Sequence, residues 1–197
     1  MKFRILSLFL FLFTLNACIK QPYELYENQF TKGLQKGILV CSILTPGLTR
    51  PIPSYYIRHL DSNESIRIYG KNTSSSQSML SIKKSQADGI GPGIVKILEL
   101  PAGKYELFTW DLFYNLGLVQ STTKPKREFS MPFEVKPDTI NYIGQLLVNQ
   151  GILYISDKSE RDIKILLKSY PSLSELPINY IKLKCVSGCN GGVEKNN

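Results

Sequence analysis

Histidine is almost absent from this sequence: His59 is the only one among 197 residues. A zinc site built on several histidines is therefore excluded, and any mechanism that needs an imidazole base must use His59. His59 follows Arg58, stands two residues before Asp61, and has no nucleophile motif of the G-x-S-x-G type beside it. We predict a surface histidine, and an envelope hydrolase that uses His59 is the alternative.

Cysteines are also few, and they offer no second pair with metal-ligand spacing, so we expect neither a metal nor another cofactor. Cys185 and Cys189 lie four residues apart and are a candidate disulfide in an oxidising compartment. Such a small loop would contribute about 2 kcal/mol. Cys41 lies in an apolar run and is expected to be a small buried hydrophobe, although pairing with a C-terminal cysteine stays open.

No apolar run is long enough to cross a bilayer. The run from Ile5 to Leu15 has eleven residues, whereas a spanning helix needs about 20. Lys2 and Arg4 precede this run and a small residue, Ala17, closes it, as in a secretory signal peptide. We therefore predict that residues 1–17 are a signal peptide.

The end of this signal, Leu15-Asn16-Ala17-Cys18, resembles the lipobox of bacterial lipoproteins, although Asn16 departs from the usual small or β-branched residue. The resemblance implies that Cys18 becomes the first mature residue and carries acyl chains such as palmitate. Two or more chains anchor a protein stably, so the membrane is an expected partner through Cys18. The expected location is the cell envelope. Ile19 stands where an Asp is associated with inner-membrane retention, which favours the outer membrane in a Gram-negative cell.

Acidic residues are outnumbered, and the net charge is +8. Without Lys2 and Arg4 it falls to +6. The remaining basic residues are scattered, which is typical of a solvated surface. Outside the cytoplasm, a basic protein meets anionic polymers and lipid headgroups, so we expect an envelope protein or an anionic polymer as partner and no nucleic acid.

The remaining chain divides into residues 18–36, a lipidated N-terminus and tether; 37–186, one mainly β domain; and 187–197, a polar tail. Short β-branched and aromatic segments separated by turn residues predict an antiparallel β-sandwich. The expected strands are 38–44, 54–60, 65–69, 79–83, 94–100, 104–114, 127–135, 139–148, 152–156 and 179–184. Pro132 predicts that 127–135 is an edge strand. Alternation along this strand predicts that Phe129, Met131, Phe133 and Val135 face the core. Asn149-Gln150-Gly151 predicts a hairpin between strands 139–148 and 152–156.

One segment has helical periodicity. Ser159 and Asp162 resemble a capping box, with Asp in place of Glu or Gln. The apolar residues that follow have the spacing of one helix face, and Pro171 ends the pattern. They are Ile163, Leu166, Leu167 and Tyr170. We predict one short amphipathic helix near residues 159–170.

The stretch from Leu98 to Leu107, Leu-Glu-Leu-Pro-Ala-Gly-Lys-Tyr-Glu-Leu, resembles the leucine-proline-x-glycine-x-tyrosine turn of transthyretin-like and related Ig-like sandwich modules. In those modules the turn joins two strands of a hairpin. Residues 141–144 and 157–170 further resemble uncharacterised bacterial lipoproteins built on such sandwiches. The likeness covers roughly residues 37–170 and implies a fold and a location, but no activity.

The carboxylates near the middle of the chain do not predict catalysis. Strand alternation from Lys104 to Tyr114 places Glu106 and Asp111 on opposite faces, which argues against an acid–base pair. Trp110 and Phe108 are expected in the core, with a carbohydrate platform as the alternative. We therefore predict a non-enzymatic binding or structural module of unknown partner. An accessory subunit of a secretion or surface-assembly complex is a further alternative.

Overall fold

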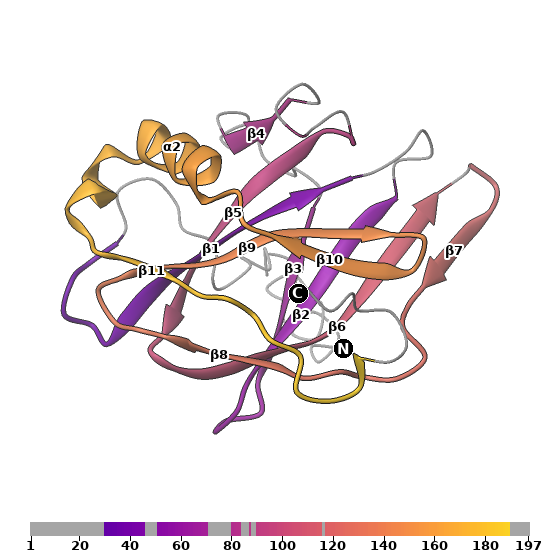
Figure 1. Ribbon diagram of the computed structural model, residues 1–197, viewed down its shortest axis with the longest axis horizontal. Helices are drawn as coiled ribbons and strands as arrows, with labels where there is room; N and C mark the ends of the chain where they lie inside the picture. The colour runs from indigo at the N-terminus through magenta and orange to yellow at the C-terminus, as the bar shows by residue number, and fades with distance from the viewer. Residues whose placement is uncertain are drawn as a thin grey trace, which may run out of the picture.

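The computed structural model describes residues 30–45, 51–70, 80–83, 87, 90–115 and 117–189. Cys18, the predicted signal peptide and residues 190–197 of the polar tail lie outside the described residues. The described chain forms two β-sheets packed together, with one short α-helix against one of them (Figure 1). The prediction of a mainly β, sandwich-like arrangement with one short helix is therefore confirmed.

Sheet A has the strand order β10-β9-β1-β5-β4, and β11 also pairs with β9. Its strands are β1 (Lys36–Leu44), β4 (Ser81–Ile82), β5 (Gly93–Pro101), β9 (Ile140–Asn149), β10 (Ile152–Ser156) and β11 (Ile178–Tyr180). Strands β9 and β10 form the hairpin predicted around residues 149–151. Gln150 and Gly151 in that turn both have positive φ angles, 51° and 79°, as a two-residue hairpin requires.

Sheet B has the order β3-β2-β6-β7, and β8 also pairs with β6. Its strands are β2 (Ile52–His59), β3 (Ser65–Tyr69), β6 (Gly103–Asn115), β7 (Gln120–Thr123) and β8 (Met131–Val135). Every pairing in this sheet is antiparallel. Within the described chain β8 pairs with β6 alone, which agrees with the edge position that Pro132 predicts.

Sheet A is mixed, so the prediction of a wholly antiparallel sandwich is wrong. Strand β1 pairs antiparallel with β5 on one side and parallel with β9 on the other. Residues Gly37–Leu44 of β1 include no exposed position, as expected for a central strand covered on both faces. Such a continuous apolar run reveals burial but not the direction of the neighbouring strands.

The turn at Pro101-Ala102-Gly103 does not form a hairpin, contrary to what the resemblance implies. Strand β5 before it belongs to sheet A and β6 after it belongs to sheet B. The turn therefore carries the chain from one sheet to the other. The hydroxyl of Tyr105 fixes it by donating a 2.9 Å hydrogen bond to the carbonyl of Pro101.

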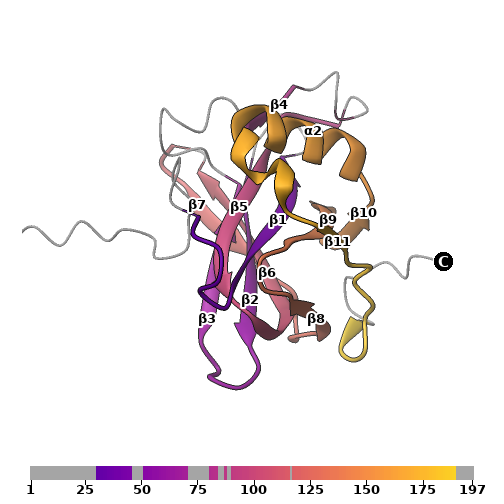
Figure 2. The same ribbon diagram turned by 90° about the vertical axis from the view of Figure 1, so that its left-hand side faces the viewer.

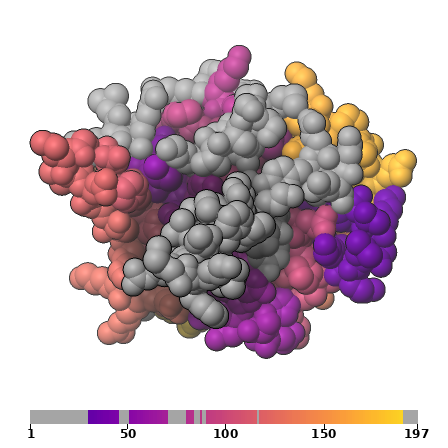
Figure 3. All heavy atoms as spheres, turned by 180° about the vertical axis from the view of Figure 1, so that it is seen from behind, coloured from indigo at the N-terminus to yellow at the C-terminus, as the bar shows by residue number. Residues whose placement is uncertain are grey.

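Helix α2 (Ser159–Ser169) and the 3-10 helix η3 (Pro171–Glu175) lie on the outer face of sheet A (Figure 2). Ile163 and Leu166 of α2 are buried, as the periodicity predicts. The N-terminal described residues lie beside η3 (Figure 3), where the Lys32 ammonium is 3.2 Å from Glu175 Oε2. Phe30 packs against the core, so the fold includes residues that precede β1.

Candidate functional site

One edge of β9 is divided between two strands. Strand β10 pairs with Gln145–Asn149 and β11 pairs with Ile140–Tyr142. The two strands run in opposite directions, and both leave β9 beside Ile143 and Gly144. A wedge therefore opens in the sheet edge at these two residues.

The same point of β9 carries a β-bulge on its other edge. Val40 of β1 lies opposite Tyr142, and Ser42 lies opposite Gln145, so Cys41 alone faces two residues of β9. Gly144 has φ +103°, and a Cβ there would lie 3.1 Å from both Ile155 Cγ2 and the Ser156 carbonyl oxygen. Glycine suits this position because other residues would be strained and crowded.

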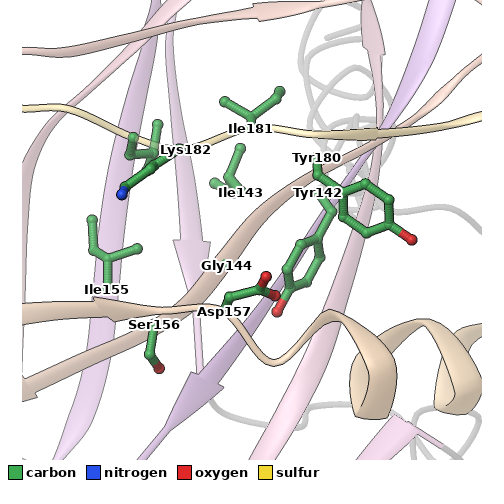
Figure 4. A pocket seen from close by; sticks show the side chains of 10 residues that line it. Tyr142, Ile143, Gly144, Ile155, Ser156, Asp157, Tyr180, Ile181 and Lys182 are labelled. Carbon is green, nitrogen blue, oxygen red and sulfur yellow. The ribbon is translucent and has the colours of Figure 1, made fainter. Parts of the chain in front are cut away.

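A pocket of about 460 Å³ opens at this wedge (Figure 4). Its size falls within the range of small-molecule sites, about 300–1,000 Å³. Its walls come from the β9 bulge, the end of β10 and the segment after β11. The lining residues are Tyr142, Ile143, Gly144, Ile155, Ser156, Asp157, Tyr180, Ile181, Lys182 and Leu183.

Two tyrosines form one side of the pocket. The rings of Tyr142 and Tyr180 are nearly perpendicular, at 73°, with centroids 6.5 Å apart. Tyr180 is 59% exposed, whereas Tyr142 is almost fully buried. Figure 4 shows Lys182 at the opposite end of the pocket from these rings and Asp157 beside Tyr142.

The segment after β11 crosses from one sheet to the other, and we call residues 181–187 the strap. At its start the Ile181 amide donates to the Tyr142 carbonyl, at 2.8 Å. At its end the Val186 amide donates to the Ser130 carbonyl and the Ser130 amide donates to the Ser187 carbonyl, at 2.8 and 2.9 Å. The strap is thus fixed to sheet A at β9 and to sheet B beside β8, and it forms one wall of the pocket.

A buried polar network lies behind the other wall, and its centre is the fully buried carboxylate of Asp162 on α2. Its Oδ2 accepts hydrogen bonds from Ser42 Oγ at 2.6 Å and from the Tyr142 hydroxyl at 2.7 Å. Its Oδ1 accepts from Arg161 Nε at 2.8 Å. Arg161 also donates to Gln145 Oε1 at 2.9 Å. The network joins α2 to β1 and to the pocket tyrosine on β9.

The ionisation of two pocket groups follows from these contacts. Burial, and then the adjacent Asp162 carboxylate, raise the pKa of the Tyr142 hydroxyl far above its usual value, so it stays protonated and donates. The Asp157 carboxylate accepts a 2.8 Å hydrogen bond from the Ser159 amide. Bonds from Ser159 hold the pKa of Asp157 below its usual range. Asp157 is therefore an anion at neutral pH.

His59 lies away from this pocket, at the end of β2. Its Nδ1 accepts hydrogen bonds from the amides of Asp61 and Ser62, both at 3.2 Å. Its ring meets Tyr105 edge-on, with centroids 4.7 Å apart. These contacts indicate a structural role for His59, which stabilises the loop between β2 and β3.

The prediction that Glu106 and Asp111 lie on opposite faces is wrong. Strand β6 has a bulge at Phe108, because Tyr56 pairs with Thr109 and the next residue, Ile57, pairs with Leu107. The extra residue reverses the alternation, so both carboxylates lie on the outer face of sheet B. Each has its own partner there.

Those partners are the outward residues of β2. Arg58 forms an ion pair with Glu106, and the Tyr56 hydroxyl donates to Asp111. Ser130 also donates to Glu106. Desolvation opposes ionisation of Glu106, but the bonds from Ser130 and Arg58 outweigh it and lower its pKa. Both carboxylates therefore stabilise the outer face of sheet B by joining β6 to β2.

The bulge also separates the two aromatic residues that were expected together in the core. Trp110 faces the core and is 1% exposed. Phe108 lies on the outer face of sheet B, where the Arg58 guanidinium covers its ring at 4.4 Å from the centroid. Both residues are therefore buried, as expected, but Phe108 is buried beneath an arginine on the outer face and not between the two sheets.

The cysteines are separated. Cys185 and Cys189, with Cα atoms 6.3 Å apart, are placed as a disulfide pair at the end of the strap. This separation suits a disulfide, and the covalent bond stays a prediction. Cys41 is fully buried in the core. Burial raises the pKa of its thiol to about 12. Cys18, the predicted lipidation site, lies outside the described residues.

The described ranges contain neither a metal-binding cluster nor a membrane-spanning helix. No group of three or more histidine, cysteine, aspartate or glutamate side chains there is arranged to hold a metal ion. Of the helices in those ranges, none has the length and apolar character needed to cross a membrane.

The chain matches no protein-family model and no curated protein. Among solved structures it is similar to a leucine-rich repeat protein from Bacteroides thetaiotaomicron, with 9% identity and a TM-score of 0.36. The similarity covers 60% of this chain but only 14% of that protein's length. A similarity this low supports no inference about fold or function.

The pocket was not anticipated from the sequence. In the sequence, two of the pocket segments, Asn141–Gly144 and the start of 157–170, were notable only because they resemble lipoproteins. Tyr180 and Lys182 belonged to an expected strand, 179–184. Strand β11 in fact ends at Tyr180. The one local signal was Gly144, a glycine inside an otherwise apolar strand, which often marks a bulge.

Proposed function

We propose that the protein is a lipid-anchored module of the bacterial cell envelope that acts by binding and not by catalysis. The observation that carries this proposal is the N-terminal sequence. A cationic start, an eleven-residue apolar run and Leu15-Asn16-Ala17-Cys18 follow one another as in lipoprotein precursors.

The membrane is the first partner, through acyl chains on Cys18. Ile19 favours the outer membrane in a two-membrane cell. The net charge of +6 without Lys2 and Arg4 suits a surface close to anionic envelope polymers. We also propose a distant relation to transthyretin-like and Ig-like sandwich modules, supported by the two packed sheets and by the sequence of the Leu-Pro-Ala-Gly-Lys-Tyr segment, although that segment joins the two sheets and not two strands of a hairpin.

The binding role is supported by the pocket at the divided edge of β9. Its walls combine two tyrosine rings, aliphatic side chains and a few polar groups, which is the usual composition of a small-molecule site. It is built on a bulge and closed by the strap, both of which are fixed by hydrogen bonds to the sheets.

The alternative of a hydrolase that uses His59 has no geometric support. A general base needs a ring nitrogen with a free lone pair and a nearby nucleophile. Nδ1 of His59 accepts from two backbone amides, so in the neutral ring the proton is on Nε2 and neither nitrogen offers a free lone pair. The alternative of an accessory subunit in a secretion or surface-assembly complex is compatible with the same anchor. Cross-linking in intact cells would favour it if discrete protein adducts formed.

Metabolic labelling with an alkynyl fatty acid tests the proposed anchor. The wild-type chain should incorporate the label and fractionate with membranes, and Cys18→Ser should do neither. Cys41→Ala is the matched control, since it removes a cysteine elsewhere and should leave labelling unchanged. An unlabelled wild-type chain, or a mature chain that retains Met1, would remove the basis of the proposal.

A further inference from the structure

The pocket beside β9 presents one charged side chain of each sign. Asp157 is held as a carboxylate by Ser159, and the exposed Lys182 supplies an ammonium at the opposite end (Figure 4). A ligand with a net charge would be attracted by one of these groups and repelled by the other. A neutral ligand with several hydroxyl groups satisfies both, because each hydroxyl can donate to Asp157 or accept from Lys182.

The pocket also offers aromatic and aliphatic surface to the same ligand. Tyr180 exposes more than half of its side chain, and its ring stands nearly perpendicular to that of Tyr142. Ile143 and Leu183 add aliphatic wall. A ligand with a C–H face as well as hydroxyl groups therefore fits better than a wholly polar one.

An extended peptide is a poorer fit. Peptides that add to a sheet need a continuous run of free strand edge. Here β10 occupies the edge of β9 from Gln145 onward and β11 occupies it up to Tyr142. Only Ile143 and Gly144 lie between the two strands, which is too short for strand addition.

The Tyr142 part of the tyrosine wall is held in place before any ligand arrives. The Tyr142 hydroxyl is hydrogen-bonded to the fully buried Asp162 and accepts a 3.2 Å bond from the Lys158 amide. Its carbonyl holds the start of the strap, at Ile181. A wall fixed in this way loses little conformational freedom on binding.

We propose that this pocket binds a neutral saccharide unit of one or two rings, with Tyr180 against the sugar face and Asp157 and Lys182 on its hydroxyl groups. The volume of about 460 Å³ suits a ligand of this size. This inference rests on the proposed binding function and names the ligand class of that site. It does not depend on how the chain is anchored.

The test uses the full chain, purified in a detergent without a sugar headgroup so that the detergent cannot compete. Chitobiose and cellobiose serve as neutral probes, glucuronic acid as an anionic probe and trialanine as a peptide probe. Ligand-observed saturation-transfer NMR should detect at least one neutral disaccharide and neither of the other two. Competition between the disaccharides should show a single site.

Two substitutions with matched controls locate the binding. Tyr180→Ala and Lys182→Ala should each weaken disaccharide binding about tenfold, as expected for one of a few anchoring side chains. Tyr114→Ala, on β6, and Lys184→Ala, on the same strap but outside the pocket, should leave it unchanged. Thermal unfolding of each variant confirms that the fold persists.

Several outcomes would overturn the inference. They are no binding of either disaccharide, preference for the anion or the peptide, or equal losses in the pocket and control variants. These outcomes are separate from the anchor test. A chain labelled at Cys18 that binds no sugar refutes the saccharide inference alone, and a sugar-binding chain without the label refutes the anchor alone.

Discussion

The hydroxyl of Tyr142 donates a 2.7 Å hydrogen bond to the carboxylate of Asp162, so a wall of the pocket is joined directly to the helix that covers sheet A. Both side chains are buried, Asp162 completely. Ser42 on β1 donates to the same oxygen. Three elements that are distant in sequence therefore depend on one carboxylate.

Replacing that carboxylate should be costly. Asp162→Asn removes the negative charge beside Arg161, whose side chain is only 15% exposed. It also offers an amide in place of an oxygen that accepts two hydroxyl donors. Removing one member of a buried ion pair typically costs about 3–5 kcal/mol, and we expect about 3 kcal/mol from urea denaturation.

Tyr142→Phe should lower the free energy of unfolding less than Asp162→Asn does. It removes one donor to the carboxylate and the acceptor of the Lys158 amide, and it leaves Ser42 and Arg161 on the carboxylate, so about 1–2 kcal/mol is expected. The double variant should lose less than the sum of the single losses, because the two groups contact each other. Additive losses would show that the hydrogen bond contributes nothing to stability.

The stability of the protein should fall at alkaline pH. Burial raises the pKa of Cys41 from 9.0 to about 12. Burial and then the bond to Asp111 raise that of Tyr56 from 10.0 to about 12. Above pH 9 the unfolded chain releases the Cys41 proton while the folded chain retains it. The free energy of unfolding therefore decreases as pH rises towards 12, by at most about 1.4 kcal/mol per pH unit from Cys41. Tyr56 contributes less because it is partly exposed and solvent screens its interactions.

Denaturant midpoints from pH 7 to pH 11 check this dependence. Cys41→Ala should be less stable at pH 7 because it leaves a small cavity. Its free energy of unfolding should begin to fall only near pH 10, where tyrosines in the unfolded chain begin to release their protons. A wild-type midpoint that stays constant between pH 9 and pH 11 would contradict the buried thiol.

Local patterns predicted those parts of the fold that depend on local physics. The spacing of Ile163 and Leu166 predicted helix α2, and the alternation of Phe129, Met131, Phe133 and Val135 predicted four residues that are all buried. The hairpin of β9 and β10 followed from its turn residues. In each case the relevant neighbours are close in sequence.

The remaining features depend on pairing between distant segments. The bulge at Phe108 appears only in the register of β6 against β2, and it moves Glu106 and Asp111 to the same face. The pocket requires β10 and β11 to share one edge of β9. Periodicity reports which side of a strand is buried, but it contains no information about which strand lies beside it.

His59→Ala should lower stability and leave function intact. The substitution removes the acceptor for the amides of Asp61 and Ser62 and the edge contact with Tyr105. The loop is exposed, so water can replace part of the hydrogen bonding, and about 1 kcal/mol is expected. Disaccharide binding and membrane fractionation should equal those of the wild type. Loss of a cellular phenotype with the fold intact would instead favour the hydrolase.

The strap should depend on the pair of cysteines at its end. Mass mapping of the unreduced protein should find Cys185 linked to Cys189 and Cys41 as a free thiol, because Cys41 is enclosed by the core while the other two lie at the edge of sheet B. Replacing both linked cysteines by serine should cost about 2 kcal/mol.

Hydrogen exchange locates that loss. The amides of Val186 and Ser130, which fix the strap to sheet B, should exchange faster in the double serine variant, whereas the amide of Ile181 at the other end should keep its protection. Faster exchange only at Val186 and Ser130 would show that the disulfide stabilises the hydrogen bonds that join this end of the strap to sheet B. A link from Cys41 to either C-terminal cysteine, or unchanged exchange in the variant, would refute that assignment.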